Sequence, residues 1–333
     1  MVHKIKAIPM NFTKKQVQDA FLGLAVADAL GVPVEFLSRE ELQRKPVSGM
    51  LSFGTHNQPA GTWSDDSSMT FCLAESLCKG YQIDDIAKKF IDWKKNAYWT
   101  AHNHVFDIGN QTHQAINRLE KFVQNQEKIV PMPNEEATEN QNGNGSLMRI
   151  LPLAFYTAHH SPEEQFFIVN QVSSLTHPHI RSVIACFIYV RLAVRLLLGQ
   201  DKFAAYEGMQ AMVRRFLQHQ QIDPKEIAVF DRILNSNIAE LPSHRIASSG
   251  YVVHTLEAAL WCLLRHENYA ETVLKAVNFG EDTDTTAAVV GGLAGIVYGS
   301  QQIPKIWLEV LVKKEEILGL SQHFHESLFV KSL

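Results

Sequence analysis

The chain has 333 residues, of which 46% are hydrophobic and 20% charged, and its formal net charge at pH 7 is −4. These proportions are ordinary for a globular protein, and they exclude an intrinsically disordered chain, which cannot bury enough apolar surface to fold. The slight negative charge gives no basic face for the phosphates of a nucleic acid. We therefore expect a folded chain that binds no free nucleic acid.

Residues 1–16 lack the uninterrupted apolar core of a signal peptide. The most apolar run, residues 183–190, lies between Arg181 and Arg191 and is far too short to span a membrane. We therefore expect a cytoplasmic protein with no membrane partner. No C-x-x-C pair occurs, so we expect reduced, buried thiols rather than a zinc or disulfide framework at Cys72, Cys78, Cys186 and Cys262.

Hydrophobic residues recur with helical spacing through most of the chain. The first helix is expected to begin after Thr13, with Gln16 as its capping-box partner, and to end at Gly31. The second is expected to start at Ser64 or Asp65. Alternating runs typical of strands are scarce, so the sequence predicts an all-α fold. Further helices are predicted over residues 83–94, 112–124, 147–156, 163–175, 181–198, 203–219, 255–264 and 284–297.

No stretch has the length or composition of an interdomain linker, and residues 130–144 are predicted to be a surface loop. One domain is therefore predicted for residues 1–333. The last predicted helix contains Gly291, Gly292 and Gly295, and each glycine costs roughly 1 kcal/mol of helix propensity. That cost is tolerable where neighbouring helices approach the backbone closely, so this helix is expected at the centre of a bundle.

Two acidic clusters stand at predicted helix starts, and each offers two carboxylates and a hydroxyl. One interpretation is N-capping, because side-chain oxygens accept backbone N–H groups there and carboxylates are favoured by the helix dipole. Capping needs only one side chain, however, and the surplus oxygen donors suit Mg²⁺ or Mn²⁺. The first cluster is Ser64, Asp65 and Asp66, and the second is Asp282, Asp284 and Thr285.

If the two clusters face each other, their four carboxylates share one pocket. Each like-charge pair near 4 Å then costs on the order of 4 kcal/mol at an effective dielectric constant of 20. Such repulsion requires either protonation or bound cations. Two divalent cations would match the four carboxylate charges, so the residues favour a site with two Mg²⁺ or Mn²⁺ ions.

Five strings resemble the ADP-ribosylglycohydrolase family, in the same order along the chain: GLAVADALGVPVEF, GTWSDDSSMTFCLAESL, NGNGSLMRILPLAF, SSLTHPH and GEDTDTTAAVVGGLAGIVYG. The segment FDIGNQTHQAI also resembles a family segment, although it is less diagnostic. Together they extend over about residues 21–298. The resemblance implies a compact orthogonal bundle of helices with two divalent metals in a central cleft. It also implies an enzyme that hydrolyses the bond at C1″ of the distal ribose of ADP-ribose.

The resemblance also implies roles for individual residues. It makes the two acidic clusters the metal ligands, and it matches Glu35, just after the GVP turn, to the family's catalytic glutamate. Without the resemblance, Glu35 could be an ordinary solvated turn residue. The family often has threonine where this chain has Ser64, but both hydroxyls can bind a metal.

Further residues are candidates for contact with the substrate. Ser174 and His177 resemble a motif that lines the family's cleft, although His177 could equally be a structural histidine. Tyr251 is a candidate for stacking on the substrate, with a core aromatic as the alternative. A glycine-rich segment before the predicted helix at residue 147 could offer backbone N–H groups to a pyrophosphate, or could be an ordinary loop: Asn142, Gly143, Asn144, Gly145 and Ser146.

Three functions remain open from the sequence. The favoured one is a metal-dependent hydrolase that removes ADP-ribose from protein side chains, with arginine preferred and Glu35 as general acid or base. The second is an immunity or binding protein that neutralises an ADP-ribosyltransferase by occupying its active site, with or without hydrolysis. The third is a metal-dependent hydrolase of another nucleotide or sugar. The complete acidic set favours an enzyme.

Overall fold

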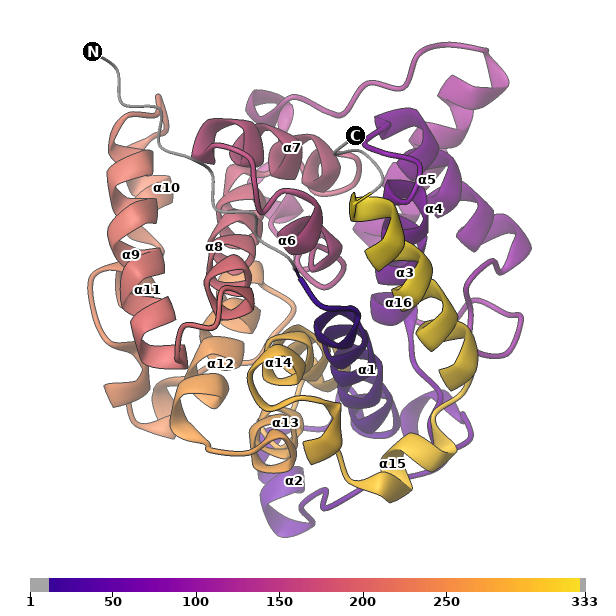
Figure 1. The fold of residues 1–333 in the computed structure, drawn as a ribbon, viewed down its shortest axis with the longest axis vertical. Helices are drawn as coiled ribbons and strands as arrows, with labels where there is room; N and C mark the ends of the chain where they lie inside the picture. Colours follow the sequence, from indigo (N-terminus) through magenta and orange to yellow (C-terminus); the bar gives the residue numbers. More distant parts are fainter. Residues whose placement is uncertain (1–11, 330–333) are drawn as a thin grey trace.

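The computed structural model describes residues 12–329, which contain sixteen α-helices and no strand (Figure 1). The prediction of an all-α fold is therefore confirmed. The helices of the first part are α1 Lys14–Gly31, α2 Arg39–Arg44, α3 Asp65–Leu77, α4 Ile83–Asn96, α5 Asn110–Gln124, α6 Pro152–Tyr156, α7 Pro162–Ser174, α8 Ile180–Leu197 and α9 Lys202–Gln218. Those of the second part are α10 Pro224–Ala228, α11 Asp231–Leu234, α12 Val252–Arg265, α13 Tyr269–Val277, α14 Thr283–Tyr298, α15 Lys305–Val310 and α16 Lys314–Phe329.

Short 3-10 helices occupy several of the connections. Two of them lie beside the candidate site, η1 Val32–Val34 directly after α1 and η2 Gly54–His56 in the connection between α2 and α3. Residues 130–144, which the sequence predicts to be a loop, contain only the short 3-10 helices η3 Asn134–Glu136 and η4 Glu139–Gln141. The remaining 3-10 helices are η5 Ile238–Glu240, η6 Ser243–Arg245 and η7 Ser300–Gln302. The N-terminal residues 1–11, which bear on the signal-peptide prediction, lie outside the described residues.

The prediction of a helix over residues 147–156 is wrong for its first five residues, because α6 begins only at Pro152. Proline has no N–H group to donate to the carbonyl of Met148, and that oxygen instead accepts a hydrogen bond from the Thr70 hydroxyl at 3.3 Å. Residues 147–151 therefore form turns. The glycine-rich segment before them does not stand at a helix N-terminus, and any anion contact there would come from loop backbone.

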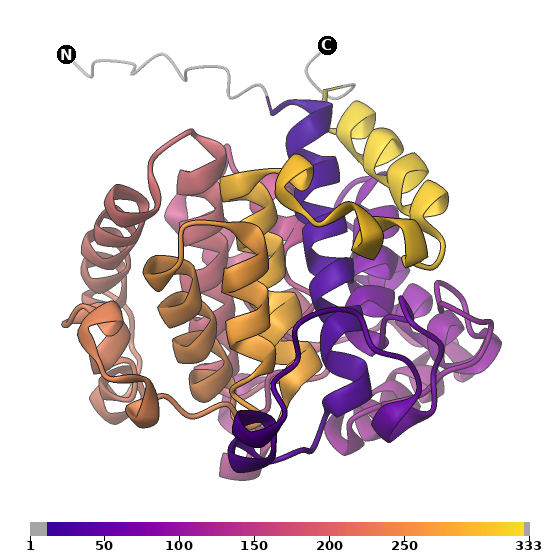
Figure 2. The same ribbon diagram turned by 90° about the horizontal axis from the view of Figure 1, so that it is seen from below.

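The close pair α1 and α14 lies at the centre of the bundle, as Figures 1 and 2 both show. A Cβ atom on Gly23 of α1 would lie 2.9 Å from the Cα of Gly295 and would also meet the backbone of Gly291. Only glycine permits this approach, and the central position expected for the glycine-containing helix is confirmed.

Helix α1 is also the one described helix that is long and apolar enough to cross a membrane by length and composition. Within the bundle, 94% of the relevant window, between Lys14 and Val34, is buried. Neighbouring helices therefore already cover its apolar surface, as expected for the core helix of a folded protein.

The packing of α1 brings the ends of three helices together. At the C-terminal end of α1, a Cβ atom on Gly31 would lie 2.6 Å from the carbonyl carbon of Thr283, at the start of α14. One turn earlier, the carboxylate of Asp28 accepts hydrogen bonds from the backbone at the start of α3. The end of α1 and the first turns of α3 and α14 therefore converge, and both acidic clusters lie at this point.

Candidate functional site

The N-terminus of α3 is capped from another helix. The Asp28 carboxylate accepts hydrogen bonds from the backbone N–H groups of Ser64 at 2.9 Å and Ser67 at 3.0 Å, and from the Ser67 hydroxyl at 2.6 Å. The Ser64 hydroxyl in turn accepts the N–H of Asp66 at 3.3 Å. Because these groups satisfy the helix end, the carboxylates of Asp65 and Asp66 are not needed as caps.

The second cluster shows the same surplus of oxygens. Asp282 occupies the N-cap position of α14 without making a side-chain cap hydrogen bond. Its Oδ2 accepts instead from the side-chain amide of Asn144 at 2.7 Å, and Asp284 Oδ1 accepts the N–H of Thr285 at 2.9 Å. Simple N-capping therefore does not account for either cluster.

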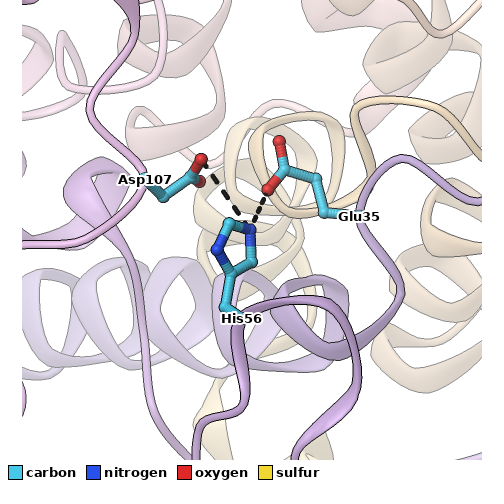
Figure 3. A group of neighbouring side chains, drawn as sticks. All are labelled: Glu35, His56 and Asp107. Atoms are coloured by element: carbon cyan, nitrogen blue, oxygen red, sulfur yellow. Dashed lines mark hydrogen bonds and ion pairs between the residues drawn. The ribbon is translucent and has the colours of Figure 1, made fainter.

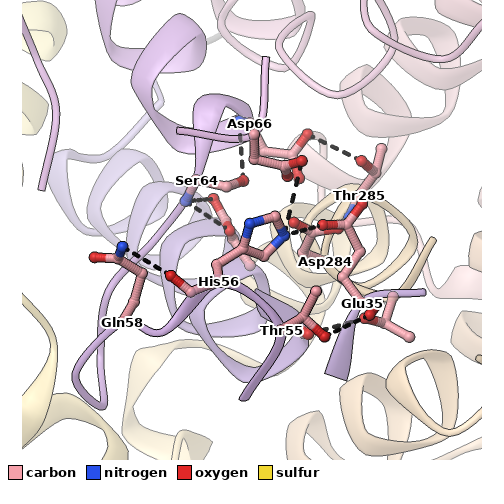
Figure 4. A network of polar contacts seen from close by, with 12 residues as sticks. Glu35, Thr55, His56, Gln58, Ser64, Asp66, Asp284 and Thr285 are labelled. Atoms are coloured by element: carbon pink, nitrogen blue, oxygen red, sulfur yellow. Dashed lines mark hydrogen bonds and ion pairs between the residues drawn. The ribbon is translucent and has the colours of Figure 1, made fainter. Parts of the chain in front are cut away.

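The two clusters face each other across a short gap, with Ser64, Asp66, Asp284 and Thr285 converging in Figure 4. The Thr285 hydroxyl donates to Asp66 Oδ1 at 3.3 Å and so joins the clusters directly. Carboxylate oxygens of Asp28, Asp66 and Asp284 lie within 4.8 Å of one another, and so do those of Glu35, Asp282 and Asp284. From the sequence alone, it could only be assumed that the two acidic clusters lie face to face.

Three oxygens of these carboxylates are buried without a hydrogen-bond partner among residues 12–329: Asp66 Oδ2, Asp282 Oδ1 and Asp284 Oδ2. Burial, followed by repulsion between neighbouring carboxylates, raises the pKa of Asp65, Asp66 and Asp284 well above the usual range. Burial also raises the pKa of Asp282. Unpartnered, mutually repelling carboxylate oxygens are the donors that divalent cations prefer, so these residues fit bound Mg²⁺ or Mn²⁺.

Glu35 follows η1 and is nearly buried, with 5% of its surface exposed. Its Oε2 is hydrogen-bonded to Nε2 of His56, and the same nitrogen lies 3.8 Å from Oδ1 of Asp107 (Figure 3). Burial, opposed by the His56 hydrogen bond and reinforced by the charges of Asp107 and Asp282, raises the pKa of Glu35 to about 8. A carboxyl group with such a pKa can donate or accept a proton near neutral pH.

A cavity of about 200 Å³ opens in front of these carboxylates. Part of its lining is acidic and consists of Glu35, Asp65, Asp107 and Asp282, together with Thr285. The other lining residues come from the start of α5, the glycine-rich segment and the residues after α7, and they are Gly109, Asn110, Gln111, Thr112, Gly143, Asn144, Gly145, Met148 and His177. The two sets meet where the side-chain amide of Asn144 donates to Asp282.

The glycine-rich segment is held in place by its backbone. The N–H of Asn144 donates to the carbonyl of Gly250 at 3.1 Å, and the N–H of Val252 donates to the carbonyl of Asn142 at 3.1 Å. A Cβ atom on Gly145 would lie 2.6 Å from the ring of His177 and 3.0 Å from the Thr112 hydroxyl. Glycine at this position therefore lets the segment pack directly against His177 and Thr112.

His177 is buried, and burial, followed by the charge of Arg149, lowers its pKa well below the usual range. The ring is therefore neutral. Arg149 donates to the hydroxyl of Thr176 at 2.6 Å, and that hydroxyl contacts Nδ1 of His177 at 2.8 Å. Because the hydroxyl accepts from Arg149 and can donate its own hydrogen to Nδ1, we assign the proton of His177 to Nε2, which lies toward Gly143.

Several candidate residues do not line this cavity. Ser174 donates to Asn170 at 2.9 Å, and Ser146 contacts Ser173 at 2.9 Å, so both hydroxyls are occupied elsewhere. Tyr251 forms a backbone bridge with Gly143, and its hydroxyl lies 3.4 Å from a nitrogen of Arg181. Ser64, Asp66 and Asp284 are buried and do not line the cavity, and neither does the partly exposed Asn142.

Sequence reasoning assigned no role to Asp28, His56 or Asp107. Asp28 and Asp107 lie within the quoted strings GLAVADALGVPVEF and FDIGNQTHQAI, which offered a signal for them. His56 stands outside every quoted string, and nothing in the sequence pointed to its contact with Glu35.

Comparison with known proteins identifies the family. The sequence model of ADP-ribosylglycohydrolase matches residues 10–332. The chain is 30% identical over 320 residues to the ADP-ribosylarginine hydrolase Tri1 of Serratia proteamaculans (strain 568), covering 95% of this chain and 80% of that protein. It is 32% identical over 314 residues to the protein of the same name from Pseudomonas putida (strain GB-1), covering 93% and 78%.

Two further relatives extend the comparison. The ADP-ribosyl-[dinitrogen reductase] glycohydrolase of Rhodospirillum rubrum is 29% identical over 308 residues, covering 89% of this chain and 90% of that protein. A solved structure described as an ADP-ribosylglycohydrolase-related protein complex superposes with a TM-score of 0.75 at 29% identity, covering 95% of this chain and 99% of that one. The chain therefore belongs to the ADP-ribosylglycohydrolase family and is an ADP-ribosyl glycohydrolase.

Proposed function

We propose that this enzyme is a divalent-metal-dependent hydrolase that removes ADP-ribose from modified arginine side chains of proteins. One observation carries the metal dependence: three buried carboxylate oxygens of the two acidic clusters have no hydrogen-bond partner, and both Asp66 and Asp282 have a carboxylate oxygen within 4.8 Å of one from Asp284. The names of the Serratia and Pseudomonas relatives support arginine as the acceptor, and that of the Rhodospirillum relative supports a protein substrate.

Two Mg²⁺ or Mn²⁺ ions would be held by the residues that the sequence singled out, Ser64, Asp65, Asp66, Asp282, Asp284 and Thr285. Bound there, divalent cations would supply Lewis-acid chemistry and orient the hydroxyl groups of the distal ribose. Asn144 holds the Asp282 carboxylate through its side-chain amide, and this fixes the direction in which the free oxygen, Oδ1, points.

The remaining roles belong to other residues that line the cavity. Glu35 transfers the proton, because its carboxyl group lines the cavity beside Asp282 and has a pKa of about 8. The backbone of Gly143 and Gly145 and the Nε2–H group of His177 line the same cavity and suit the anionic pyrophosphate of the substrate. The phosphates of ADP-ribose would then lie beside the glycine-rich segment.

Turnover is favoured over simple occupation of a transferase's active site. A protein that only binds a transferase would need no buried carboxylates with free oxygens, since unpaired buried charges destabilise the fold. The site retains three such oxygens in residues 12–329. Binding to a cognate transferase through another surface is compatible with this activity.

The direct test is to incubate the protein with arginine- and serine-linked ADP-ribosyl proteins, each with Mg²⁺, with Mn²⁺ and with chelator, and to measure released ADP-ribose. We expect release from the arginine-linked substrate in either metal and none with chelator. Equal release with chelator would disprove the metal dependence, and release from the serine-linked substrate alone would disprove the acceptor.

Asp65→Ala and Asp284→Ala test the ligand assignment. Each should abolish hydrolysis while the helical content, measured by circular dichroism, stays near that of the wild type. A variant that turned over substrate at the wild-type rate in metal-limited buffer would show that its residue is not a ligand.

A further inference from the structure

His56 has an unusual place beside the proton-transfer group. Its ring lies at the end of η2, and its Nε2 is shared between two carboxylates, hydrogen-bonded to Glu35 and 3.8 Å from Asp107 (Figure 3). Only 14% of the His56 side chain is exposed. In residues 12–329, it is the only basic side chain paired with Glu35. The proposed function assigns no role to the contact between His56 and Glu35.

The ring of His56 is aimed by its surroundings. It lies between two phenylalanines, with its centroid 5.9 Å from that of Phe36 and 5.3 Å from that of Phe106. Such ring pairs restrict both the position and the tilt of an imidazole. The contact with Glu35 therefore comes from a ring with little freedom to turn away.

The segment that carries His56 also grips the backbone of Glu35. The Thr55 hydroxyl donates to the carbonyl oxygen of Glu35 at 2.7 Å (Figure 4). Gly54, with a φ of +60°, lies against Pro33 so closely that a Cβ atom would be 2.7 Å from the Pro33 carbonyl carbon. Residues 54–56 thus hold Glu35 at its main chain and at its carboxyl group.

Glu35 needs such a partner for an electrostatic reason. Its other charged neighbours are carboxylates, since oxygens of Asp107, Asp282 and Asp284 each lie within 4.8 Å of a Glu35 oxygen. Without an opposing donor, the flexible glutamate side chain would turn away from these like charges. A displacement of about 1 Å of a catalytic group can cost on the order of 10²-fold in rate.

We propose that His56 is a positioning residue, which holds the carboxyl group of Glu35 toward the reacting bond through the Nε2 contact. The inference rests on the proposed role of Glu35 in proton transfer. It assigns no contact between His56 and the substrate. It predicts that the hydrogen-bonding group at the end of the side chain matters for turnover, while the ring itself does not.

Two substitutions separate these features. His56→Phe keeps an aromatic ring between Phe36 and Phe106 but removes the hydrogen bond. His56→Gln removes the ring but places an amide N–H where Nε2 lies. The variants are assayed on the substrate that the wild type cleaves, whether arginine- or serine-linked. The test of His56 therefore does not depend on which amino acid is the acceptor.

We expect His56→Phe to lower kcat by about 10- to 100-fold. Its dissociation constant for ADP-ribose in saturating Mg²⁺, measured by calorimetry, should stay within about twofold of the wild type, and its melting temperature should be retained. His56→Gln should recover most of kcat. A ring that only fills space would give the opposite order, with His56→Phe active and His56→Gln unstable.

His104→Phe is the matched control. This exposed histidine also contacts the ring of Phe106, with centroids 5.9 Å apart, but makes no hydrogen bond to Glu35. It should keep the wild-type kcat. The inference is overturned if His56→Phe turns over at the wild-type rate, if His56→Gln is as deficient as His56→Phe, or if the loss in His56→Phe lies in ADP-ribose affinity alone.

Discussion

The buried carboxylates differ in their partners, and their partners decide what each can do. Asp28 is fully engaged, with its oxygens accepting hydrogen bonds from Ser64 and Ser67. Asp66 and Asp284 each keep one oxygen free. Asp28 therefore caps α3, and we expect it to bind no metal, although one of its oxygens lies within 4.8 Å of oxygens of the other two.

Glu35 is expected to act in the chemical step alone, because it lies outside both acidic clusters. Glu35→Gln keeps the volume of the side chain and removes its ionisation. The variant should bind ADP-ribose and metal with near-native affinity, while kcat falls by roughly 10² to 10⁴, as is typical for loss of a general acid or base. Calorimetry and steady-state kinetics separate the two effects. Weakened binding with unchanged turnover would instead make Glu35 a ligand.

Glu257 gives a pH-dependent contribution to stability away from the site. Only 2% of its side chain is exposed, and burial, opposed by the charge of Arg232 at 3.0 Å, raises its pKa to about 7. The folded state therefore holds this proton more tightly than the unfolded state, whose pKa is near 4.5. The resulting stability is complete below pH 4.5 and is lost as the pH rises to about 7.

Glu257→Gln removes this titration with little change in volume. Relative to the wild type, the variant should gain on the order of 1–3 kcal/mol in its free energy of unfolding between pH 5 and pH 8. Urea unfolding at the two pH values measures the difference. A constant difference between variant and wild type at both pH values would show that Glu257 does not titrate in this range.

The sequence could identify the acidic clusters and Glu35 because each stands in a short, ordered string that resembles a family segment. It could not identify His56, since the approach of η2 to Glu35 depends on the path of the chain between α2 and α3. Contacts of this kind are tertiary and leave no local pattern.

At the scale of helices, the sequence was most informative where the local signal was long or specific. The capping box of Thr13 and Gln16 is present at the start of α1, and α3 begins at Asp65 as expected. Six helices had no predicted counterpart, namely α2, α10, α11, α13, α15 and α16, and four of them have six residues or fewer. Such short segments contain too few turns for a periodic pattern to emerge.

The contact between α1 and α14 can be tested at Gly291. A Cβ atom there would meet Ala27 and would lie 2.5 Å from the carbonyl oxygen of Gly23. Gly291→Ala should therefore destabilise the protein by about 1–3 kcal/mol, despite the better helix propensity of alanine. It should also weaken metal binding, because the same contact sets the position of Asp284 on α14 relative to α1, whose Asp28 holds the start of α3 beside it.

Gly319→Ala is the matched control for that substitution. Gly319 lies inside α16, and nothing stands within 4 Å of a Cβ atom at this position. The control should gain up to about 1 kcal/mol from helix propensity. Thermal unfolding of both variants, with metal titration of each, gives the comparison. Equal stabilisation by the two substitutions would contradict close packing of α1 against α14.

Across the whole molecule, the site joins parts of the chain that are far apart in sequence. Its carboxylates come from the connections after α1 and before α5, the start of α3 and the start of α14, and its neutral lining comes from α5, the segment before α6 and His177. Substrate and cations would therefore bridge elements from both halves of the chain. Metal binding should in consequence be coupled to folding of the bundle.

This coupling predicts opposite effects of one substitution with and without metal. Asp66 is fully buried and repelled by neighbouring carboxylates, so Asp66→Asn removes an unfavourable charge at nearly constant volume. In chelator, the variant should melt at a higher temperature than the wild type. In excess Mg²⁺ or Mn²⁺ the order should reverse, because the wild type gains about 2.7 kcal/mol at a metal concentration 100 times its dissociation constant, while the variant has lost a ligand.

Asp284→Asn, in the other cluster, should behave in the same way. Differential scanning calorimetry of the three proteins in both buffers measures the effect. A metal-induced shift that survives either substitution would show that the cations do not bind between the two clusters.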